Sequence, residues 1–200
     1  MVEEYDSIVQ NNVWDVVPRP KDKSFVNSCW IYKVKQATDG SVDKHKSIFV
    51  ARGFLQVEGI DYDEIFSPVA RYSSIRSILA LSTQMGWSIH QMDVKTACLN
   101  GMIKEEVYIE HPEGFETLDH ESDVCRLKRE SYGLIQAPRA WYTRIDRYFT
   151  GPGFRKSEAD VNLYHIVVEG KLLIIVLYVD DLILKGDENL IKYCKEDLAR

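Results

Sequence analysis

The sequence has no apolar run long enough to cross a membrane. The longest one, Leu172 to Val179, is eight residues, whereas a membrane-spanning helix needs roughly 20. The N-terminus reads Met-Val-Glu-Glu-Tyr-Asp and has neither the basic start nor the apolar centre of a signal peptide. We therefore expect no membrane partner and an intracellular, cytoplasmic location.

Cysteine is scarce and scattered, and no two of the four cysteines form a CxxC pair. This spacing excludes the common zinc motifs, and a chain of 200 residues does not need a disulfide framework to bury a core. Low-complexity segments and internal repeats are also absent. With 45% hydrophobic and 28% charged residues, the composition is that of a globular chain and excludes a disordered or fibrous one.

Positive charge is in deficit overall, since the net charge is −6, but its distribution is uneven. Between Arg19 and Phe54 there are eight Lys or Arg against three Asp, whereas Lys104 to Asp123 holds eight acids and one Lys. A basic N-terminal third can hold phosphates whatever the sum over the chain. Two ordinary solvated faces would give the same pattern, so charge alone leaves both interpretations open.

Most of the basic residues fall on a predicted hairpin. Residues 29–35 are rich in β-formers, Asp39-Gly40 is a turn signal, and residues 48–52 form the returning strand, so we expect two strands joined by an extended loop. Its basic residues are Lys33, Lys35, Lys44, Lys46 and Arg52.

The rest of the chain alternates between strand and helix patterns. Strands are expected over 87–94, 107–109, 124–128, 163–168, 172–179 and 182–184; helices are expected from Ser73 or Ser74 to Gly86, from Pro138 to Phe149, and over 188–199. Interleaved strands and helices with hairpins indicate an α+β fold with an antiparallel sheet.

Two adjacent aspartates, Asp180 and Asp181, stand between the apolar stretches Leu-Tyr-Val and Leu-Ile-Leu. Two unpaired carboxylates in such a place would repel each other and cost several kcal/mol to desolvate, a cost that a divalent cation removes. Aspartates are also common in hairpin turns. Asp93 ends a predicted strand and would complete a set of three oxygen ligands of the kind that Mg²⁺ prefers, if an antiparallel sheet brings it beside Asp180.

These residues belong to an ordered set of motifs that runs from about Asn11 to the end of the chain. The set comprises VWDVVPRP (13–20), FVARGF (49–54), GIDY (59–62), FSPV (66–69), QMDVKTA (91–97), QAPRAWY (136–142) and LYVDD (177–181). In this order they resemble the reverse transcriptase domain of copia-type LTR retrotransposons, part of a Pol polyprotein.

The resemblance implies RNA-directed DNA synthesis by a two-metal mechanism on a right-hand polymerase fold. Asp93 matches the first catalytic carboxylate, and Asp180 and Asp181 match the Y-x-D-D pair, with Val94 contributing its backbone. The implied cofactor is Mg²⁺, with Mn²⁺ as the alternative. The implied partners are an RNA template, a DNA primer, dNTPs and, in an intact element, the RNase H and integrase parts of the polyprotein. The implied location in an intact element is a cytoplasmic virus-like particle.

The resemblance also assigns the binding residues. Lys46, Arg52, Val94, Cys98 and Tyr132 match nucleotide-binding positions, and Gly133, Gln136, Pro138 and Tyr178 match positions that contact template and primer. Cys98 stands where the family usually has Phe, whose ring excludes a ribose 2′-hydroxyl. Glu130 and Ile135 replace a usual Ser and Lys, and Lys185 a usual Thr.

The implied domain division is fingers over about 11–70 and 101–135 and palm over about 71–100 and 136–200, in one reverse transcriptase fragment without thumb, RNase H, integrase or protease. We expect a truncated copy. Two alternatives remain open: an inactive or co-opted nucleic-acid-binding remnant and, more remotely, a metal-dependent phosphohydrolase or nuclease. The second would also use three aspartates but would not require the basic hairpin or the QAPRAWY segment.

Overall fold

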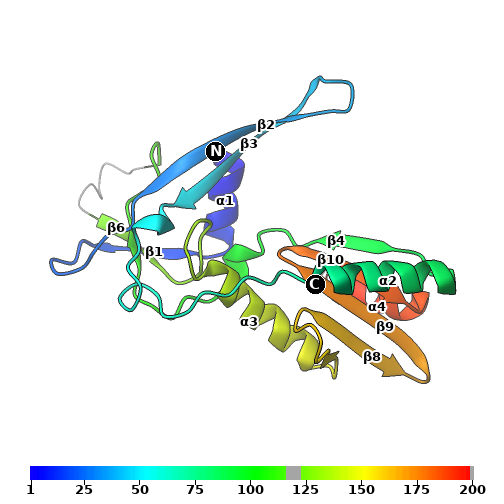
Figure 1. The fold of residues 1–200 in the computed structure, drawn as a ribbon. Helices are drawn as coiled ribbons and strands as arrows, with labels where there is room; N and C mark the ends of the chain where they lie inside the picture. Colours follow the sequence, from blue (N-terminus) through cyan, green and yellow to red (C-terminus); the bar gives the residue numbers. More distant parts are fainter. Residues whose placement is uncertain (116–122, 199–200) are drawn as a thin grey trace. The chain divides into compact units, whose positions relative to one another are not determined.

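The computed structural model describes residues 1–115 and 123–198 (Figure 1). The chain forms two compact units: unit 1 comprises Met1–Phe66 and Cys98–Trp141, and unit 2 comprises Ser67–Ala97 and Tyr142–Arg200. Each unit has its own sheet and core, described separately below.

Unit 1 combines a helix, a three-stranded sheet and a long hairpin. Its elements are α1 (Val2–Gln10), β1 (Trp14–Pro18), β2 (Ser28–Gln36), β3 (Val42–Ala51), β5 (Tyr108–Ile109), β6 (Asp123–Leu127) and 3₁₀ turns at Gly53–Leu55 and Cys98–Asn100. The sheet has the order β1-β6-β5, and β2 pairs with β3 alone. All pairs of these strands are antiparallel.

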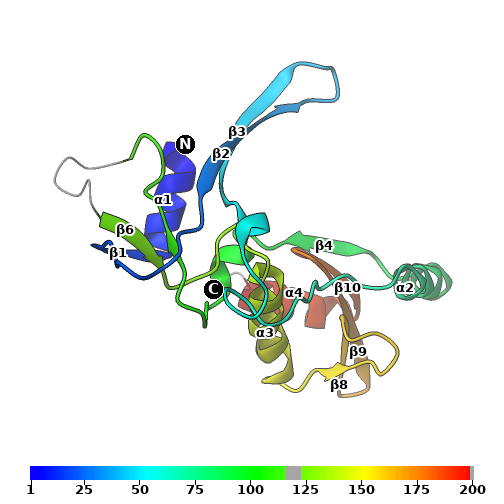
Figure 2. The same cartoon turned by 60° about the vertical axis from the view of Figure 1, so that its left-hand side comes forward.

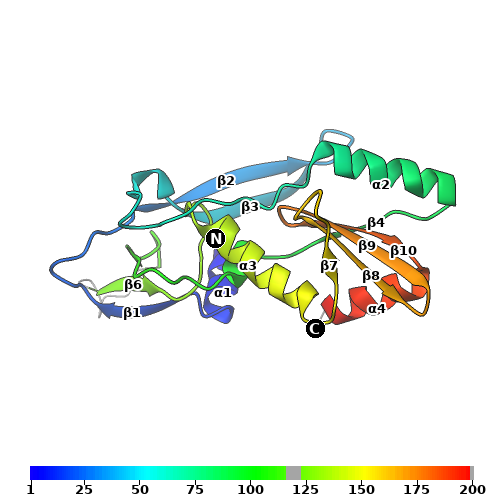
Figure 3. The same cartoon turned by 60° about the horizontal axis from the view of Figure 1, so that its bottom comes forward.

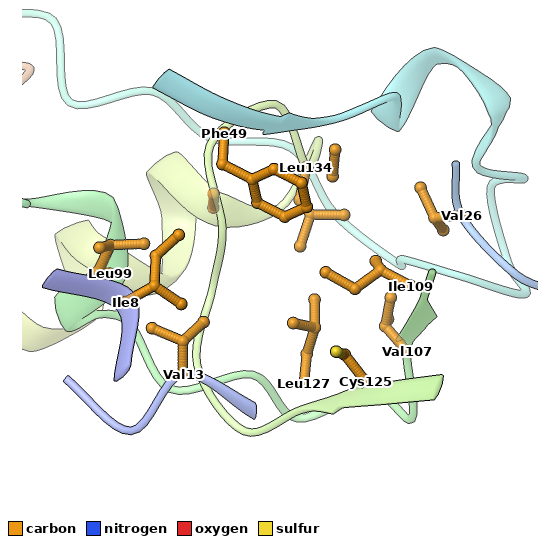
Figure 4. Close-up of a cluster of buried hydrophobic side chains, with 12 residues drawn as sticks. Ile8, Val13, Val26, Phe49, Leu99, Val107, Ile109, Cys125, Leu127 and Leu134 are labelled. Carbon is orange, nitrogen blue, oxygen red and sulfur yellow. The ribbon is translucent and has the colours of Figure 1, made fainter. Parts of the chain in front are cut away.

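The core of unit 1 gathers residues from segments far apart in the sequence (Figure 4). Ile8 of α1, Phe49 of β3 and Leu127 of β6 are each at most 4% exposed. Trp30 and Trp14 pack against Phe49, with ring centroids 5.2 and 5.9 Å away. Burial of apolar surface stabilises a fold by about 25 cal/mol per Å². This cluster therefore holds α1, the base of the hairpin and the β1-β6-β5 sheet together.

Unit 2 is a five-stranded antiparallel sheet between helices. Its elements are α2 (Tyr72–Met85), β4 (His90–Asp93), β7 (Arg155–Lys156), β8 (Leu163–Val168), β9 (Lys171–Tyr178), β10 (Asp181–Gly186) and α4 (Glu188–Leu198). The strand order is β4-β10-β9-β8-β7. Helix α3 (Ala137–Thr150) starts in unit 1 and continues into unit 2.

The two faces of this sheet are covered by different helices (Figure 3). Ile78 of α2 packs with Ile174 and Val176 of β9. The alternate residues of β9, Ile175 and Leu177, point to the opposite face and are fully buried. This explains why β9 is an almost continuous apolar run: a central strand covered on both faces needs apolar side chains on both. No helix within the described residues is long and apolar enough to span a membrane.

The expected α+β class with antiparallel sheets is confirmed. The hairpin is longer than expected, because β2 and β3 together leave only residues 37–41 as a loop. The strand expected over 87–94 is shorter and covers only His90–Asp93. Helix α1 and strands β1 and β7 were not among the expected elements.

The start of α2 differs from the expectation as well. The helix begins at Tyr72, so the N-cap is Arg71, which has no capping side chain of its own, and neither Ser73 nor Ser74 occupies the cap. The cap comes instead from Asp160, which is 4% exposed and accepts the Arg71 N–H at 2.8 Å. Ser74 donates its hydroxyl to the same carboxylate. The predicted C-terminal residue is confirmed, since Gly86 adopts the left-handed conformation with φ 66°.

Asp160 also accepts the Asn162 N–H at 3.0 Å. Burial raises the pKa of this carboxyl, but the hydrogen bonds from Ser74, Arg71 and Asn162 and the Arg71 charge outweigh burial and hold the pKa below its ordinary value of 3.8. Because the folded pKa is depressed, this stabilisation is present above the ordinary Asp range and is lost as pH falls through the folded pKa.

We expect Asp160→Ala to lower the free energy of unfolding by about 2–3 kcal/mol at neutral pH, because a buried charge-assisted cap is removed from α2. Urea denaturation followed by circular dichroism measures the effect. The matched control is Ser73→Ala, at an exposed position in the same helix turn, which should change stability by less than about 0.5 kcal/mol. Equal losses in the two variants would show that Asp160 is not the cap.

Candidate functional site

Three aspartates lie at one end of the unit 2 sheet. Asp93, the last residue of β4, stands directly opposite Asp181, the first residue of β10. Antiparallel partners in such positions share one face, with Cβ atoms about 4.5–5.5 Å apart. Asp180 lies in the two-residue turn between β9 and β10. The fold thus places Asp93 at the same sheet end as the adjacent pair Asp180 and Asp181, although Asp180 follows Asp93 by 87 positions in the sequence.

The turn that carries Asp180 is strained. Val179 has a φ of 57°, a left-handed conformation that is rare for a β-branched residue. Two hydrogen bonds fix the turn: the Val179 N–H donates to the Pro68 carbonyl at 2.6 Å, and the Asp180 carbonyl accepts the Val94 N–H at 2.9 Å. Strain of about 1–3 kcal/mol persists only where the surroundings over-determine it, and it is concentrated at functional sites.

Val94 therefore uses its N–H to fasten the end of β4 to the Asp180 turn. The resemblance assigns Val94 to nucleotide binding through its backbone, and in the structure its N–H has a protein acceptor. This leaves the backbone carbonyl of Val94 as the group of this residue that suits a metal ion.

The aspartate end is polar and open. Asp93 and Asp180 are exposed and Asp181 is half-buried, and Gln91 donates its Nε2 to Asp181 Oδ1 at 3.0 Å. No Lys or Arg in the described ranges forms an ion pair with these three carboxylates. Three hard oxygen donors without a cationic partner suit a divalent cation by donor type. Among the described residues no three His, Cys, Asp or Glu side chains converge as a ready metal site, so the fit rests on donor chemistry and backbone register.

Gln91 was not predicted as a site residue. The signal was present, because Gln91 lies two positions before Asp93 on the same strand and therefore shares its face. Tyr178, a predicted contact to template or primer, ends β9, where it stands opposite Asp181 and bridges Val69.

In unit 1 two glycine-containing segments are packed backbone to backbone. Ala51 donates its N–H to the Tyr132 carbonyl at 2.7 Å. A Cβ on Gly53 would lie 2.0 Å from the Gly133 carbonyl oxygen, and a Cβ on Gly133 would lie 2.1 Å from the Ala51 carbonyl oxygen. Gly133 also has a φ of 91°. Both positions require glycine, because any side chain would force the end of β3 away from the segment at 132–133.

Two glutamine side chains connect the same segments. Gln56 donates its Nε2 to Gln136 Oε1 at 3.1 Å, and Gln56 Oε1 accepts the Ile135 N–H at 2.9 Å. Gln136 is 4% exposed, and its Nε2 has no partner among the described residues. A buried amide donor without an acceptor costs about 1–3 kcal/mol. The Nε2 of Gln136 is therefore available to donate a hydrogen bond to a bound ligand. Pro138 lies in the first turn of α3, where proline is tolerated.

The remaining predicted residues of unit 1 fall around this packing. Arg52 directly follows β3 and is exposed, with no ion-pair partner in the described part of the chain. Cys98 and Tyr132 are partly buried against the unit 1 core. Lys46 lies earlier in β3, in the exposed part of the hairpin.

The predicted site residues therefore divide into two groups. Unit 2 holds Asp93, Val94, Tyr178, Asp180 and Asp181, and unit 1 holds Lys46, Arg52, Cys98, Tyr132, Gly133, Gln136 and Pro138. Within unit 1, Arg52, Tyr132, Gly133 and Gln136 come together through the contacts between the end of β3 and the segment leading to α3.

Comparison with known proteins agrees with this arrangement of motifs. Residues 11–200 match the family model described as "Reverse transcriptase (RNA-dependent DNA polymerase)". The chain is 40% identical over its whole length to the retrovirus-related Pol polyprotein from transposon TNT 1-94 of Nicotiana tabacum, and 37% identical to that from transposon RE2 of Arabidopsis thaliana. It is 30% identical over 90% of its length to the transposon Ty1-LR3 Gag-Pol polyprotein of Saccharomyces cerevisiae.

The chain spans 15% of the tobacco polyprotein, 14% of the Arabidopsis one and 10% of the yeast one. The match to the family model covers nearly every residue described above. The chain belongs to the reverse transcriptase (RNA-dependent DNA polymerase) family, as its resemblance to copia-type retrotransposon domains predicted.

Proposed function

We propose that this chain is the polymerase part of a retrotransposon Pol polyprotein and transfers deoxynucleotides to a primer 3′-hydroxyl on an RNA template. The observation that carries the proposal is the register of unit 2, which sets Asp93 opposite Asp181 and ties Val94 to Asp180. A metal-dependent phosphohydrolase would need the same acids, but family membership and the basic hairpin favour the polymerase.

Asp93, Asp180, Asp181 and the carbonyl of Val94 would hold two Mg²⁺ ions, or Mn²⁺ in their place. When bound, the ions activate the primer hydroxyl and stabilise the pyrophosphate leaving group. The strained Val179 turn fixes the backbone of Asp180 relative to β4, so the carboxylates would have to reorient only their side chains to hold a cation together. Gln91 orients Asp181 through its hydrogen bond.

Unit 1 supplies the residues that would bind nucleotide and template. Arg52 has a guanidinium without an ion-pair partner in the described part of the chain, which suits bidentate contact with a phosphate. Lys46 is the second cation that family resemblance assigns to the nucleotide. Tyr132 would stand near the sugar, and Gln136 could donate from its Nε2, which has no partner among the described residues. Gly133 and Pro138 would contact template and primer, with Tyr178 from unit 2.

We further propose that unit 1 corresponds to the fingers and unit 2 to the palm of a right-hand polymerase. The division of the chain into 1–66 with 98–141, and 67–97 with 142–200, supports this assignment because its boundaries fall near those expected from the motifs. In an intact element, RNase H and integrase would be carried on other parts of the polyprotein.

The test is a primer-extension assay with the purified chain, an RNA template, a DNA primer, dNTPs and Mg²⁺. Template-directed extension that needs all four dNTPs supports the proposal. Template binding without extension would indicate a nucleic-acid-binding remnant, and release of phosphate or cleavage of the strand without synthesis would indicate a phosphohydrolase or nuclease.

Cys98 leads to a prediction about sugar selectivity. The cysteine side chain has several fewer heavy atoms than the phenylalanine usual in the family. It would therefore exclude a ribose 2′-hydroxyl less effectively by steric contact. We expect Cys98→Phe to lower the ratio of ribonucleotide to deoxynucleotide incorporation by about tenfold or more. Single-nucleotide extension with UTP and dTTP measures it.

The competing explanation is that Cys98 matters only for packing, since it lies against the unit 1 core. A larger side chain there changes stability by about 1–3 kcal/mol. A Cys98→Phe variant with altered thermal stability and an unchanged ribo-to-deoxy ratio would establish that explanation.

A further inference from the structure

The hairpin formed by β2 and β3, drawn as a ribbon in Figure 2, carries four lysines on one face by its strand register. Lys33 stands directly opposite Lys46, and Lys35 directly opposite Lys44. Directly opposed residues share a face, and so do alternate residues along each strand. All four side chains are exposed. We call this set, Lys33, Lys35, Lys44 and Lys46, the lysine face.

The lysine face is unfavourable for the isolated hairpin. Like charges directly opposite each other destabilise a strand pair, and here two such pairs follow each other. Among the described residues their only ion pair is Lys44 with Glu3, at 3.4 Å, and that pair is exposed on both sides. An exposed pair of this kind contributes about 0–1 kcal/mol. Lys46 also lies near the Glu4 carboxyl, whose pKa its charge acts to lower. Lys33 and Lys35 form no ion pair within the described ranges, so much of the positive charge on this face is uncompensated.

The opposite face of the hairpin is already covered. Phe49 packs with Ile8 of α1 in the unit 1 core, and Tyr32, on the same face as Trp30 and Phe49, donates its hydroxyl to Met1 Sδ at 3.1 Å. Helix α1 therefore lies behind the base of the hairpin, and the lysine face is the one left to solvent.

The spacing fits one phosphate backbone. Along each strand the two lysines are about 7 Å apart, and across the strands about 5 Å, from standard sheet dimensions. A patch of this size can follow one strand over a few phosphates but cannot reach both backbones across a major groove about 12 Å wide. Next to the lysines on this face stand Ile31 and Ile48, which offer no hydrogen bonds to base edges, so binding would not depend on sequence.

We infer that the lysine face binds the phosphate backbone of a single nucleic-acid strand. The inference rests on the proposed function for the origin of that strand, the template, and it assigns Lys46 to the strand in preference to the nucleotide triphosphate. Like-charge repulsion between the opposed lysines is relieved when phosphates lie between them, so binding and hairpin stability are coupled.

Binding is tested with the whole chain and a fluorescein-labelled oligouridylate, by anisotropy over a range of salt and without Mg²⁺ or dNTPs. The variants are Lys33→Gln with Lys46→Gln, Lys35→Gln with Lys44→Gln, and all four together. Each lysine that contacts a phosphate contributes about 0.7 to the salt slope on a single strand. We therefore expect the slope to become shallower by about 1.4 for each pair and about 3 for all four.

The matched control is Lys21→Gln with Lys104→Gln, which removes the same charge from two exposed positions of unit 1. It should leave the slope nearly unchanged. An equal change in control and hairpin variants would mean that only net charge matters and would overturn the inference. Thermal unfolding checks folding: relief of like-charge pairs should leave the melting temperature of the hairpin variants unchanged or raise it.

Primer extension separates the inference from the proposed function. If the hairpin variants bind the oligonucleotide normally but show a raised KM for dNTPs, the lysines serve the triphosphate and the inference is wrong while the polymerase stands. If no variant or parent extends a primer, yet binding still depends on the four lysines, the proposed function is wrong while the inference stands.

Discussion

Replacement of Asp180 by Asn is expected to reduce primer extension by about 10³-fold or more. Under the proposed function Asp180 would lose the charge with which it would hold a catalytic cation. Metal-assisted stabilisation of a transition state amounts to several kcal/mol, and each 1.4 kcal/mol equals a factor of ten in rate. Asp93→Asn should have an effect of the same order, because Asp93 stands at the same sheet end. Single-turnover extension with a preformed primer-template measures both.

The fold should tolerate these substitutions. Asp93 and Asp181 are like charges directly opposite each other, and such pairs are destabilising, so Asp93→Asn should leave the melting temperature unchanged or raise it. The control is Asp63→Asn, at an exposed position of unit 1, which should alter neither extension nor stability. Activity retained in Asp180→Asn would contradict the assignment of Asp180 as a metal ligand.

A second signature distinguishes loss of metal binding from loss of substrate. In the parent chain, Mg²⁺ should protect against unfolding, because a ligand that binds the folded state stabilises it. Asp180→Asn should lose this Mg²⁺-dependent shift while binding oligonucleotide normally. A variant that loses oligonucleotide binding in parallel would point to a wider structural change.

Local sequence patterns predict much of this fold. The hairpin β2–β3 and the pair β9–β10 each join neighbouring segments through short turns, so alternation and turn residues suffice to place them. The Asp180 turn is such a case, because apolar runs on both sides leave only a tight connection. Gly86 is predictable for a similar reason, since a helix end in the left-handed conformation favours glycine.

Contacts between distant segments are not predictable from such patterns. Strand β1 pairs with β6, which sets Trp14 opposite Leu127, and nothing in the local sequence of either segment specifies the other. The cap of α2 is a second example. Ser73 and Ser74 lie nearer in the sequence and are of a residue type that commonly caps helices, but the capping carboxylate comes from Asp160. The pairing of β4 with β10 was expected only because the resemblance brought Asp93 and Asp180 into one site.

Glu130 shows the same limit and has a large predicted consequence. From the sequence it is a charged residue where the family usually has Ser, and nothing local indicates burial. In unit 1 it is 1% exposed, and its Oε2 has no hydrogen-bond partner among the described residues. Burial, with a smaller contribution from the charge of Glu105, raises the pKa of this carboxyl from 4.5 to about 8.

The raised pKa makes stability depend on pH. Below pH 4.5 the Glu130 carboxyl is protonated in both the folded and the unfolded chain, so it does not make the free energy of unfolding depend on pH. Between 4.5 and about 8 the unfolded chain releases this proton while the folded chain retains it, so the free energy of unfolding falls by about 1.4 kcal/mol per pH unit. The total loss by alkaline pH is about 5 kcal/mol, on the scale of the whole stability of a small domain.

We therefore expect Glu130→Gln, which keeps the shape and removes the titration, to abolish this pH dependence. The variant should match the parent near about pH 5 and exceed it by several kcal/mol near about pH 9, measured as urea unfolding at each pH. Glu105→Gln should act in the same direction by a smaller amount, because it removes the neighbouring charge that helps to raise the Glu130 pKa. Glu58→Gln, at an exposed position, is the matched control and should leave the pH profile unchanged. A parent chain whose unfolding free energy is flat between pH 5 and 9, or a Glu130→Gln variant that retains the slope, would show that Glu130 is ionised in the folded state and that its carboxylate reaches water or a cation.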